Sequence, residues 1–437
     1  MRNLYPEKFM TLATEDILHI FMAIGLLLAA SHMAGYLAGL FRQARVIGEI
    51  IGGLILGPTL LGVFSPEIHR WLFFDNAPTR TILGGLYQSG LFLLMFCSGL
   101  EMRSSFQLGE RKTAVINAIV GILIPMVGAL LAIQHVDFAP LLGTAQSLPA
   151  LHMVFGIAIA VTSIPVISRI LHDLGFLDTP FGRIVLLCAV LEDIILYVLL
   201  AVVLSMVGGS QSEFSGITRF LHLAPGSWPF LLCHTVAALI FLAVSVKVGP
   251  HLFRWAGAHR FNLLGVSSPV AFQIVFMLLL IGMAIFFGIT PMFGAFVAGI
   301  ISGRSDEDSH DARKTIQTFS FAFFIPLYFA LVGLRLDLLR NFDPVFFLLF
   351  LLFACAIKIA SIFLGSRLSG EKSWGAWNLA VAMNARGGPG IVLASLALDA
   401  AIISEGFYVS LVMLAIATSM LAGFWFNLIH RKKWPLR

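Results

Sequence analysis

Two adjacent carboxylates, Glu192 and Asp193, lie in the middle of an apolar run from Ile184 to Val207 that contains no other charged residue. A run of this length is typical of a transmembrane helix. A carboxylate near the centre of a bilayer costs roughly 3 kcal/mol on insertion scales, so it needs a partner, water or an ion. The pair therefore predicts an ion or proton site inside a membrane protein.

Asp193 is the first candidate for a site that takes a cation and a proton in turn. A carboxylate binds either a hard monovalent cation or a proton, one at a time, and this competition is the chemistry of exchange. The alternative is a carboxylate that serves only as a buried hydrogen-bond anchor. Glu192 lies about 100° around the helix from Asp193, so the two side chains are not expected to face one point.

Lys358 is the only lysine deep within a predicted span, and it needs an anionic partner. Glu192 and Asp193 are the two candidates for that partner. The resulting pair could take part in transport, or it could be a permanent salt bridge that only holds two helices together. Both interpretations stay open at this stage. Glu49, near a predicted helix end, is interpreted as a structural carboxylate.

Two predicted spans are interrupted by helix-breaking residues. The first contains Thr162, Ser163 and Pro165, and proline removes a backbone donor, so we expect the helix to unwind around Thr162. The second contains Asn384 and Arg386, followed by a glycine-rich stretch. Irregular backbone at membrane depth is tolerated only inside the protein or along a cavity.

These breaks should leave backbone groups that need partners. We expect Arg386 to offset the partial negative charge where a half-helix ends, and Asn384 to hydrogen-bond freed backbone groups. An arginine that snorkels to an aqueous cavity is the alternative for Arg386. Simple packing kinks are the alternative for the breaks themselves, although two breaks beside a carboxylate pair favour a site.

Composition places the whole chain in a membrane. Its 437 residues are 59% hydrophobic and 12% charged, which predicts an all-α polytopic membrane protein. The apolar runs predict about thirteen transmembrane helices, at residues 16–41, 46–64, 81–102, 112–134, 149–173, 181–207, 228–250, 266–288, 291–303, 317–339, 344–367, 374–399 and 404–430.

The loops predict the orientation of these helices. Lysine and arginine gather in the loops that face the cytoplasm when the N-terminus is outside and the C-terminus is cytoplasmic. Counted as six helices, a linker and six helices, the two breaks fall on the fifth helix of each half. The halves would then be two inverted six-helix repeats, and paired broken helices in such repeats point to a transport site at the midplane.

Five segments, in this order, resemble the motifs of monovalent cation/proton antiporters, in the branch with Kef-type, NapA-type and plant cation/proton exchangers. They are GEIIGGLILGPTLLG at 48–62, TSIPVISRIL at 162–171, FGAFVAG at 293–299, PLYFALVGL at 326–334 and MNARG at 383–387. The resemblance runs from about residue 46 to 420. It implies secondary active exchange of Na⁺ or K⁺ for protons by alternating access.

The resemblance also implies a domain organisation within a single transmembrane exchanger domain, 1–437. A core transport part, about 112–207 and 344–430, would move against a dimerisation part, about 16–102 and 266–339, with a linker helix at about 228–250. Asp193 matches the family's essential aspartate and Lys358 its membrane lysine. Glu192 departs from the usual Asp, Asn or Gln, and an acidic residue there goes with electrogenic members.

The expected partners are Na⁺ or K⁺, H⁺, membrane lipid and a second copy of the chain in a homodimer. We expect an integral protein of a bacterial inner or cell membrane, with no cofactor, no nucleic acid partner and no metal site beyond the transported monovalent cation. Two alternatives remain: a channel-like or uniport cation pathway, and an intramembrane enzyme. The sequence argues against the enzyme, because it shows no Ser/His pairing, His-Glu-x-x-His motif or paired-aspartate arrangement.

Overall fold

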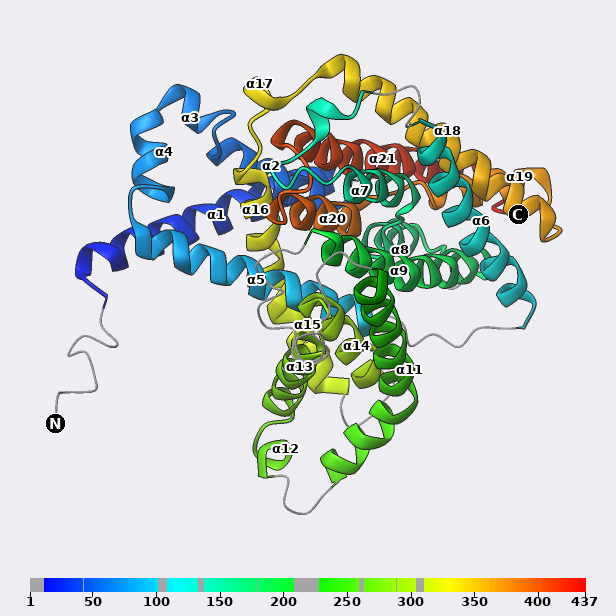
Figure 1. Cartoon of the computed structure of the whole chain (residues 1–437), viewed down its shortest axis with the longest axis horizontal. Coiled ribbons are helices and arrows are strands. Elements are labelled where there is room, and N and C mark those ends of the chain that lie inside the picture. Colours follow the sequence, from blue (N-terminus) through cyan, green and yellow to red (C-terminus); the bar gives the residue numbers. More distant parts are fainter. Residues whose placement is uncertain are drawn as a thin grey trace.

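The computed structural model describes residues 12–41, 43–100, 108–132, 137–177, 179–207, 228–258, 263–287, 289–303 and 310–437. These residues are almost entirely helical, as predicted (Figure 1), and their only β pairing is an isolated bridge between Leu142 and Ile403. The principal helices are α1 (Thr14–Leu40), α2 (Arg45–Leu56), α3 (Leu61–Phe64), α5 (Ala77–Leu100), α6 (Leu108–Ala132), α7 (Leu148–Ala160), α8 (Ile164–Asp173), α9 (Pro180–Met206), α11 (Trp228–Ala258), α13 (Pro269–Phe286), α14 (Pro291–Gly303), α15 (His310–Phe319), α16 (Ile325–Leu334), α18 (Pro344–Leu368), α19 (Ser373–Ala382), α20 (Gly387–Asp399) and α21 (Glu405–Lys432).

Within the described ranges, nine helical segments are long and apolar enough to cross a membrane, and eleven when each bent helix pair counts as one span. The bent pairs are α19 with α20 and the two parts of α11. Two further apolar helices, α7 and α14, are shorter. Helix α7 forms the first part of the predicted span 149–173, which continues after a break as α8, and α14 coincides with the predicted span 291–303. The count of thirteen therefore stays a prediction that depends on these two spans.

The long helices pack in two groups (Figure 1). In the first, which we call the α2–α16 group, α1 packs on α2, α2 and α5 on α16, and α5 and α13 on α14. In the second, the α9–α20 group, α6 packs on α7, α9 and α18, α8 on α9, α20 and α21, and α18 on α19. Helix α11 contacts α9 of one group and α14 of the other.

Glycines bring the backbones of the α2–α16 group into direct contact. A Cβ added to Gly53 of α2 would lie 1.9 Å from the carbonyl oxygen of Ala330, and one added to Gly333 of α16 would lie 2.0 Å from that of Ile50. Small residues allow this close approach, which strengthens van der Waals packing between membrane helices. The backbones of α2 and α16 are therefore in contact at a glycine of each helix.

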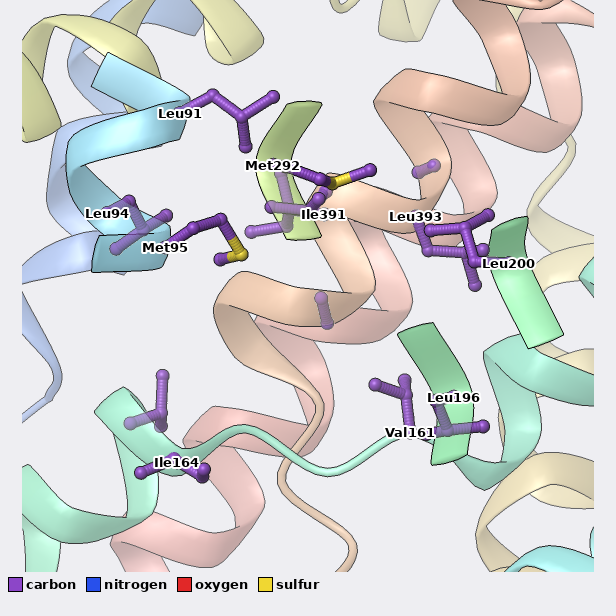
Figure 2. Close-up of a cluster of buried hydrophobic side chains, with 14 of the residues drawn as sticks. Leu91, Leu94, Met95, Val161, Ile164, Leu196, Leu200, Met292, Ile391 and Leu393 are labelled. Carbon is purple, nitrogen blue, oxygen red and sulfur yellow. The ribbon is translucent and has the colours of Figure 1, made fainter. Parts of the chain in front are cut away.

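An apolar cluster fills the boundary between the two groups (Figure 2). Side chains from α5 and α14 face α20, and side chains from α9 pack on its other side. The cluster includes Leu91, Leu94, Met95, Met292, Ile391, Leu393, Leu196 and Leu200. Helix α20, which begins at the second break, thus lies at this boundary.

Candidate functional site

The first helix break lies where the sequence predicts it. Helix α7 ends at Ala160, residues 161–163 are not helical, and α8 begins at Ile164. Val161 is extended, with φ −63° and ψ 141°. Pro165 lies in the first turn of α8, where a missing N–H costs nothing, although its side chain lies outside the described residues.

The second break crosses the first. Helix α19 ends at Ala382, α20 begins at Gly387, and their axes differ by 42°. The backbone N–H of Ser163 donates to the carbonyl oxygen of Ala385 at 2.7 Å, and that of Gly388 donates to Ser163 Oγ at 3.2 Å. Ser163 therefore joins the two breaks directly.

Gly387 makes this crossing possible. Its φ is +20°, and an added Cβ would lie 2.3 Å from Val166 Cγ2 and 2.6 Å from Ser163 Oγ. Only a residue without a side chain fits between the two broken helices at this point.

Lys358 of α18 pairs with Glu192 of α9, which decides between the two predicted partners. Lys358 Nζ lies 2.8 Å from Glu192 Oε1, and both side chains are fully buried. Lys358 also donates to the carbonyl oxygens of Ala160 and of Gly121, the latter at 3.2 Å. The ammonium group thus uses all three of its donors, and one of its acceptors is the last carbonyl of α7.

Thr162 brings the first break to the same pair. Its hydroxyl oxygen lies 2.7 Å from Glu192 Oε2 and 2.6 Å from the carbonyl oxygen of Met383. A hydroxyl has one proton to donate and can accept other protons. When Thr162 donates to Met383, its contact with Glu192 is a hydrogen bond only if Glu192 carries a proton.

Asp193 is buried, with 2% of its surface exposed, and its Oδ1 has no hydrogen-bond partner among the described residues. Buried polar atoms are nearly always paired, because leaving a carboxylate oxygen without a partner in an apolar medium is costly. A bound proton or a bound cation would remove this cost. The two adjacent carboxylates therefore differ: Glu192 has hydrogen-bond partners for its oxygens, whereas Asp193 Oδ1 has none among the described residues.

Arg386 satisfies backbone groups that the breaks leave free. Its guanidinium, 1% exposed, donates to the carbonyl oxygens of Ala158 and Ile159 near the end of α7, at 3.1 and 3.0 Å, and to that of Ala354 at 2.9 Å. The predicted position at a half-helix end is confirmed, and the snorkelling alternative is wrong, because the side chain is enclosed.

The prediction that Asn384 bonds freed backbone groups is wrong. Its Oδ1 accepts from Arg386 Nη1 at 2.8 Å, and its Nδ2 donates to Cys355 Sγ at 3.3 Å. Asn384 therefore orients Arg386, which makes the backbone contacts itself.

Sequence reasoning missed two hydroxyls of α21 that hold the second break. The N–H of Arg386 donates to Thr418 Oγ1 at 3.2 Å, and that of Gly387 donates to Ser419 Oγ at 3.3 Å. The adjacent Thr and Ser in an apolar span were the available signal. It is weak, because hydroxyls in membrane helices commonly bond their own helix.

Replacing Thr162 by valine is expected to weaken apparent cation affinity on the order of ten-fold, with a smaller effect on the maximal rate. The change keeps the shape but removes the one hydroxyl proton that Glu192 Oε2 and the Met383 carbonyl share, which leaves a buried acceptor without a donor at about 1–3 kcal/mol. Exchange rates measured against cation concentration test this. Thr79→Val is the matched control, because Thr79 is a buried hydroxyl of α5 that bonds Asn76 away from the site. Unchanged affinity in Thr162→Val would exclude a role for this hydroxyl in binding.

Comparison with known proteins gives a consistent result. Residues 26–432 match the family described as "Sodium/hydrogen exchanger, transmembrane". The Na(+)/H(+) antiporter NhaS4 of Synechocystis sp. is 28% identical over 413 residues, which cover 94% of this chain and 97% of that protein. The K(+)/H(+) antiporter 1 of Saccharomyces cerevisiae is 30% identical over 393 residues, which cover 87% of this chain and 43% of that protein.

The fold has a solved counterpart. The sodium proton antiporter MjNhaP1 from Methanocaldococcus jannaschii superposes with a TM-score of 0.66, covering 95% of this chain and 99% of that one. The two sequences are 14% identical, so this likeness concerns the fold alone.

Proposed function

The chain belongs to the transmembrane sodium/hydrogen exchanger family, and from that premise we propose that it exchanges a monovalent cation, Na⁺ or K⁺, for protons across a membrane. Relatives that align over most of this chain are named Na⁺/H⁺ or K⁺/H⁺ antiporters. The description of the family and the names of these relatives are those of transporters rather than enzymes.

The observation that carries the proposal is the buried Asp193 Oδ1, which has no hydrogen-bond partner in the part of the chain that the structure describes. We propose that Asp193 holds the transported cation and the proton in turn. A carboxylate in this position needs a positive charge or a proton at every stage of the cycle. Loading on one side and release on the other then couple the two ions, since both use the same oxygens.

Glu192 and Lys358 support this role by balancing charge next to Asp193. With both groups ionised the pair is neutral as a unit; Glu192 then accepts from Lys358 and from the Thr162 hydroxyl, and Lys358 also donates to the last carbonyl of α7. When the cation is bound, Asp193 holds it and the Glu192–Lys358 pair stays ionised beside it. Freed carbonyls and half-helix ends at a crossing of broken helices commonly hold ions in transporters.

We propose alternating access by displacement of the α9–α20 group against the α2–α16 group. The glycine contacts between α2 and α16 favour the α2–α16 group as the static part. In residue terms, the moving core is about 112–207 and 344–430, the dimerisation part is about 16–102 and 266–339, and the linker is about 228–250. A homodimer in a bacterial inner or cell membrane, with the N-terminus outside and the C-terminus cytoplasmic, completes the proposal.

One ion pair is placed to close the outer side in this scheme. Arg335, just after α16, lies 2.9 Å from Asp399 at the end of α20, and its guanidinium carbon lies 4.8 Å from the centre of the Tyr87 ring. It therefore ties one group to the other at the end that the predicted topology puts outside. Movement of the groups would require this contact to open.

The test is cation-dependent proton flux in proteoliposomes. Recovery of a quenched pH-sensitive dye after addition of Na⁺, K⁺, Li⁺ or choline chloride would identify the cation. Exchange requires recovery with at least one metal cation and none with choline. Cation currents without proton movement would instead indicate a uniport pathway and contradict the proposal.

We expect the exchange to be electrogenic, with more than one proton per cation. Glu192 provides a second buried carboxylate, and the Thr162 hydroxyl between two acceptors accommodates a proton there. Each charge moved contributes roughly 2.3 kcal/mol per 100 mV of membrane potential. Current on a solid-supported membrane after a cation jump should show net charge, and Glu192→Gln should reduce it. Robust dye-detected exchange with no net charge would make the Glu192–Lys358 pair a structural bridge.

A further inference from the structure

A cavity of about 1070 Å³ lies between α1 and α2 of one group and α8 and α21 of the other. The cavity lies at those ends of the four helices that the predicted topology places at the cytoplasmic face. Its lining includes Tyr36, Leu40, Phe41, Arg45, Phe424 and Arg431. None of the residues used by the proposed exchange site belongs to this lining.

The charge of the lining has one sign. Arg45, Arg169 and Arg431 come from α2, α8 and α21, and no aspartate or glutamate is among the lining residues of the described chain. Glu49, one turn further along α2, is buried and does not line the cavity. The guanidinium groups of Arg45 and Arg431 repel a cation and favour a phosphate, which guanidinium groups bind through paired N–H donors.

The other wall of the cavity is apolar and open. Leu40, Phe41 and Phe424 are 62%, 78% and 67% exposed, and Tyr36 is 64% exposed. These exposed apolar side chains suit contact with acyl chains. The cavity is therefore amphipathic, with arginines on one side and an apolar, lipid-accessible surface on the other.

We propose that this cavity binds an anionic phospholipid of the cytoplasmic leaflet. Arg45 and Arg431 bind its phosphate, and its acyl chains lie on the surface formed by Leu40, Phe41 and Phe424. Basic pockets between membrane helices on this side bind anionic headgroups. A free phosphate would use the arginines but would leave the apolar wall without a function. The bound lipid contacts both helix groups, and this inference does not depend on cation/proton exchange.

The experiment is lipid binding to the purified full-length protein in detergent, measured by native mass spectrometry. The probes are dioleoylphosphatidylglycerol, dioleoylphosphatidylcholine and inorganic phosphate. We expect phosphatidylglycerol to bind most tightly, and Arg45→Gln/Arg431→Gln to weaken it roughly 30-fold. This estimate follows because each basic side chain contributes about 1 kcal/mol and 1.4 kcal/mol is ten-fold.

Two controls keep the result specific. Arg45→Lys/Arg431→Lys retains the charge and should retain most of the binding. Lys314→Gln/Lys372→Gln removes two exposed charges that do not line the cavity and should leave binding unchanged. Equal binding of the two lipids, unchanged binding in Arg45→Gln/Arg431→Gln, or inorganic phosphate binding as tightly as phosphatidylglycerol would each overturn the proposal.

Discussion

Replacing Asp193 by asparagine is expected to reduce cation-dependent proton flux to the level of protein-free liposomes, while the protein stays folded. The amide keeps the shape of the side chain, but it cannot carry a proton and a cation in turn. Oδ1 has no hydrogen-bond partner to lose among the described residues, so stability should change by less than about 1 kcal/mol. Dye recovery in proteoliposomes and the melting temperature in detergent measure the two effects.

Glu49→Gln is the matched control for this variant. Glu49 is also a buried carboxylate, and its Oε2 has no hydrogen-bond partner within the described ranges, but it lies on α2, outside the two broken helices. We expect it to keep the exchange. Wild-type flux in Asp193→Asn, or an equal loss in both variants, would show that Asp193 is not the specific carrier.

Replacing Lys358 by methionine is expected to destabilise the protein by about 3–5 kcal/mol, because it leaves Glu192 buried without its charge partner. Adding Glu192→Gln to Lys358→Met should recover most of this loss. The double variant replaces both charges together, and a buried ion pair is often no more stable than neutral groups of similar volume. Thermal unfolding in detergent gives the three values of this double-mutant cycle.

Arg335→Met is the control that shows how much of the Lys358→Met effect comes from the burial of the ion pair. The Arg335–Asp399 pair has nearly the same separation, 2.9 Å, but its side chains are 42% and 36% exposed. Exposed pairs contribute up to about 1 kcal/mol, so a small loss is expected here. A similarly small loss in Lys358→Met would mean that water reaches the Glu192–Lys358 pair.

The sequence predicted the components of the site because each breaks a strong rule of membrane helices. Charges at Glu192, Asp193 and Lys358 are costly in apolar spans, and the stretches around Thr162 and Gly387 cannot continue a helix. These features are local, so they can be read from neighbouring residues. The two breaks and the pairing of Lys358 with a carboxylate followed from them.

The contacts between components could not be predicted, because they join residues far apart in the chain. Thr162 reaches a carbonyl 221 residues away, and Arg386 reaches one 228 residues away. Lys358 could pair with either carboxylate, and Asn384 could bond either the backbone or Arg386. Which contact forms depends on the direction in which each side chain leaves its helix. The sequence fixes neither direction.

Proton release on cation binding tests the central claim most directly, because it asks whether one carboxylate takes either ion. Na⁺ or K⁺ is added to weakly buffered, purified protein in detergent, and a pH-sensitive dye reports released protons. We predict release that saturates with cation concentration, is absent with choline and is absent in Asp193→Asn. Saturable cation binding without proton release, or equal release from Asp193→Asn, would contradict exchange at Asp193.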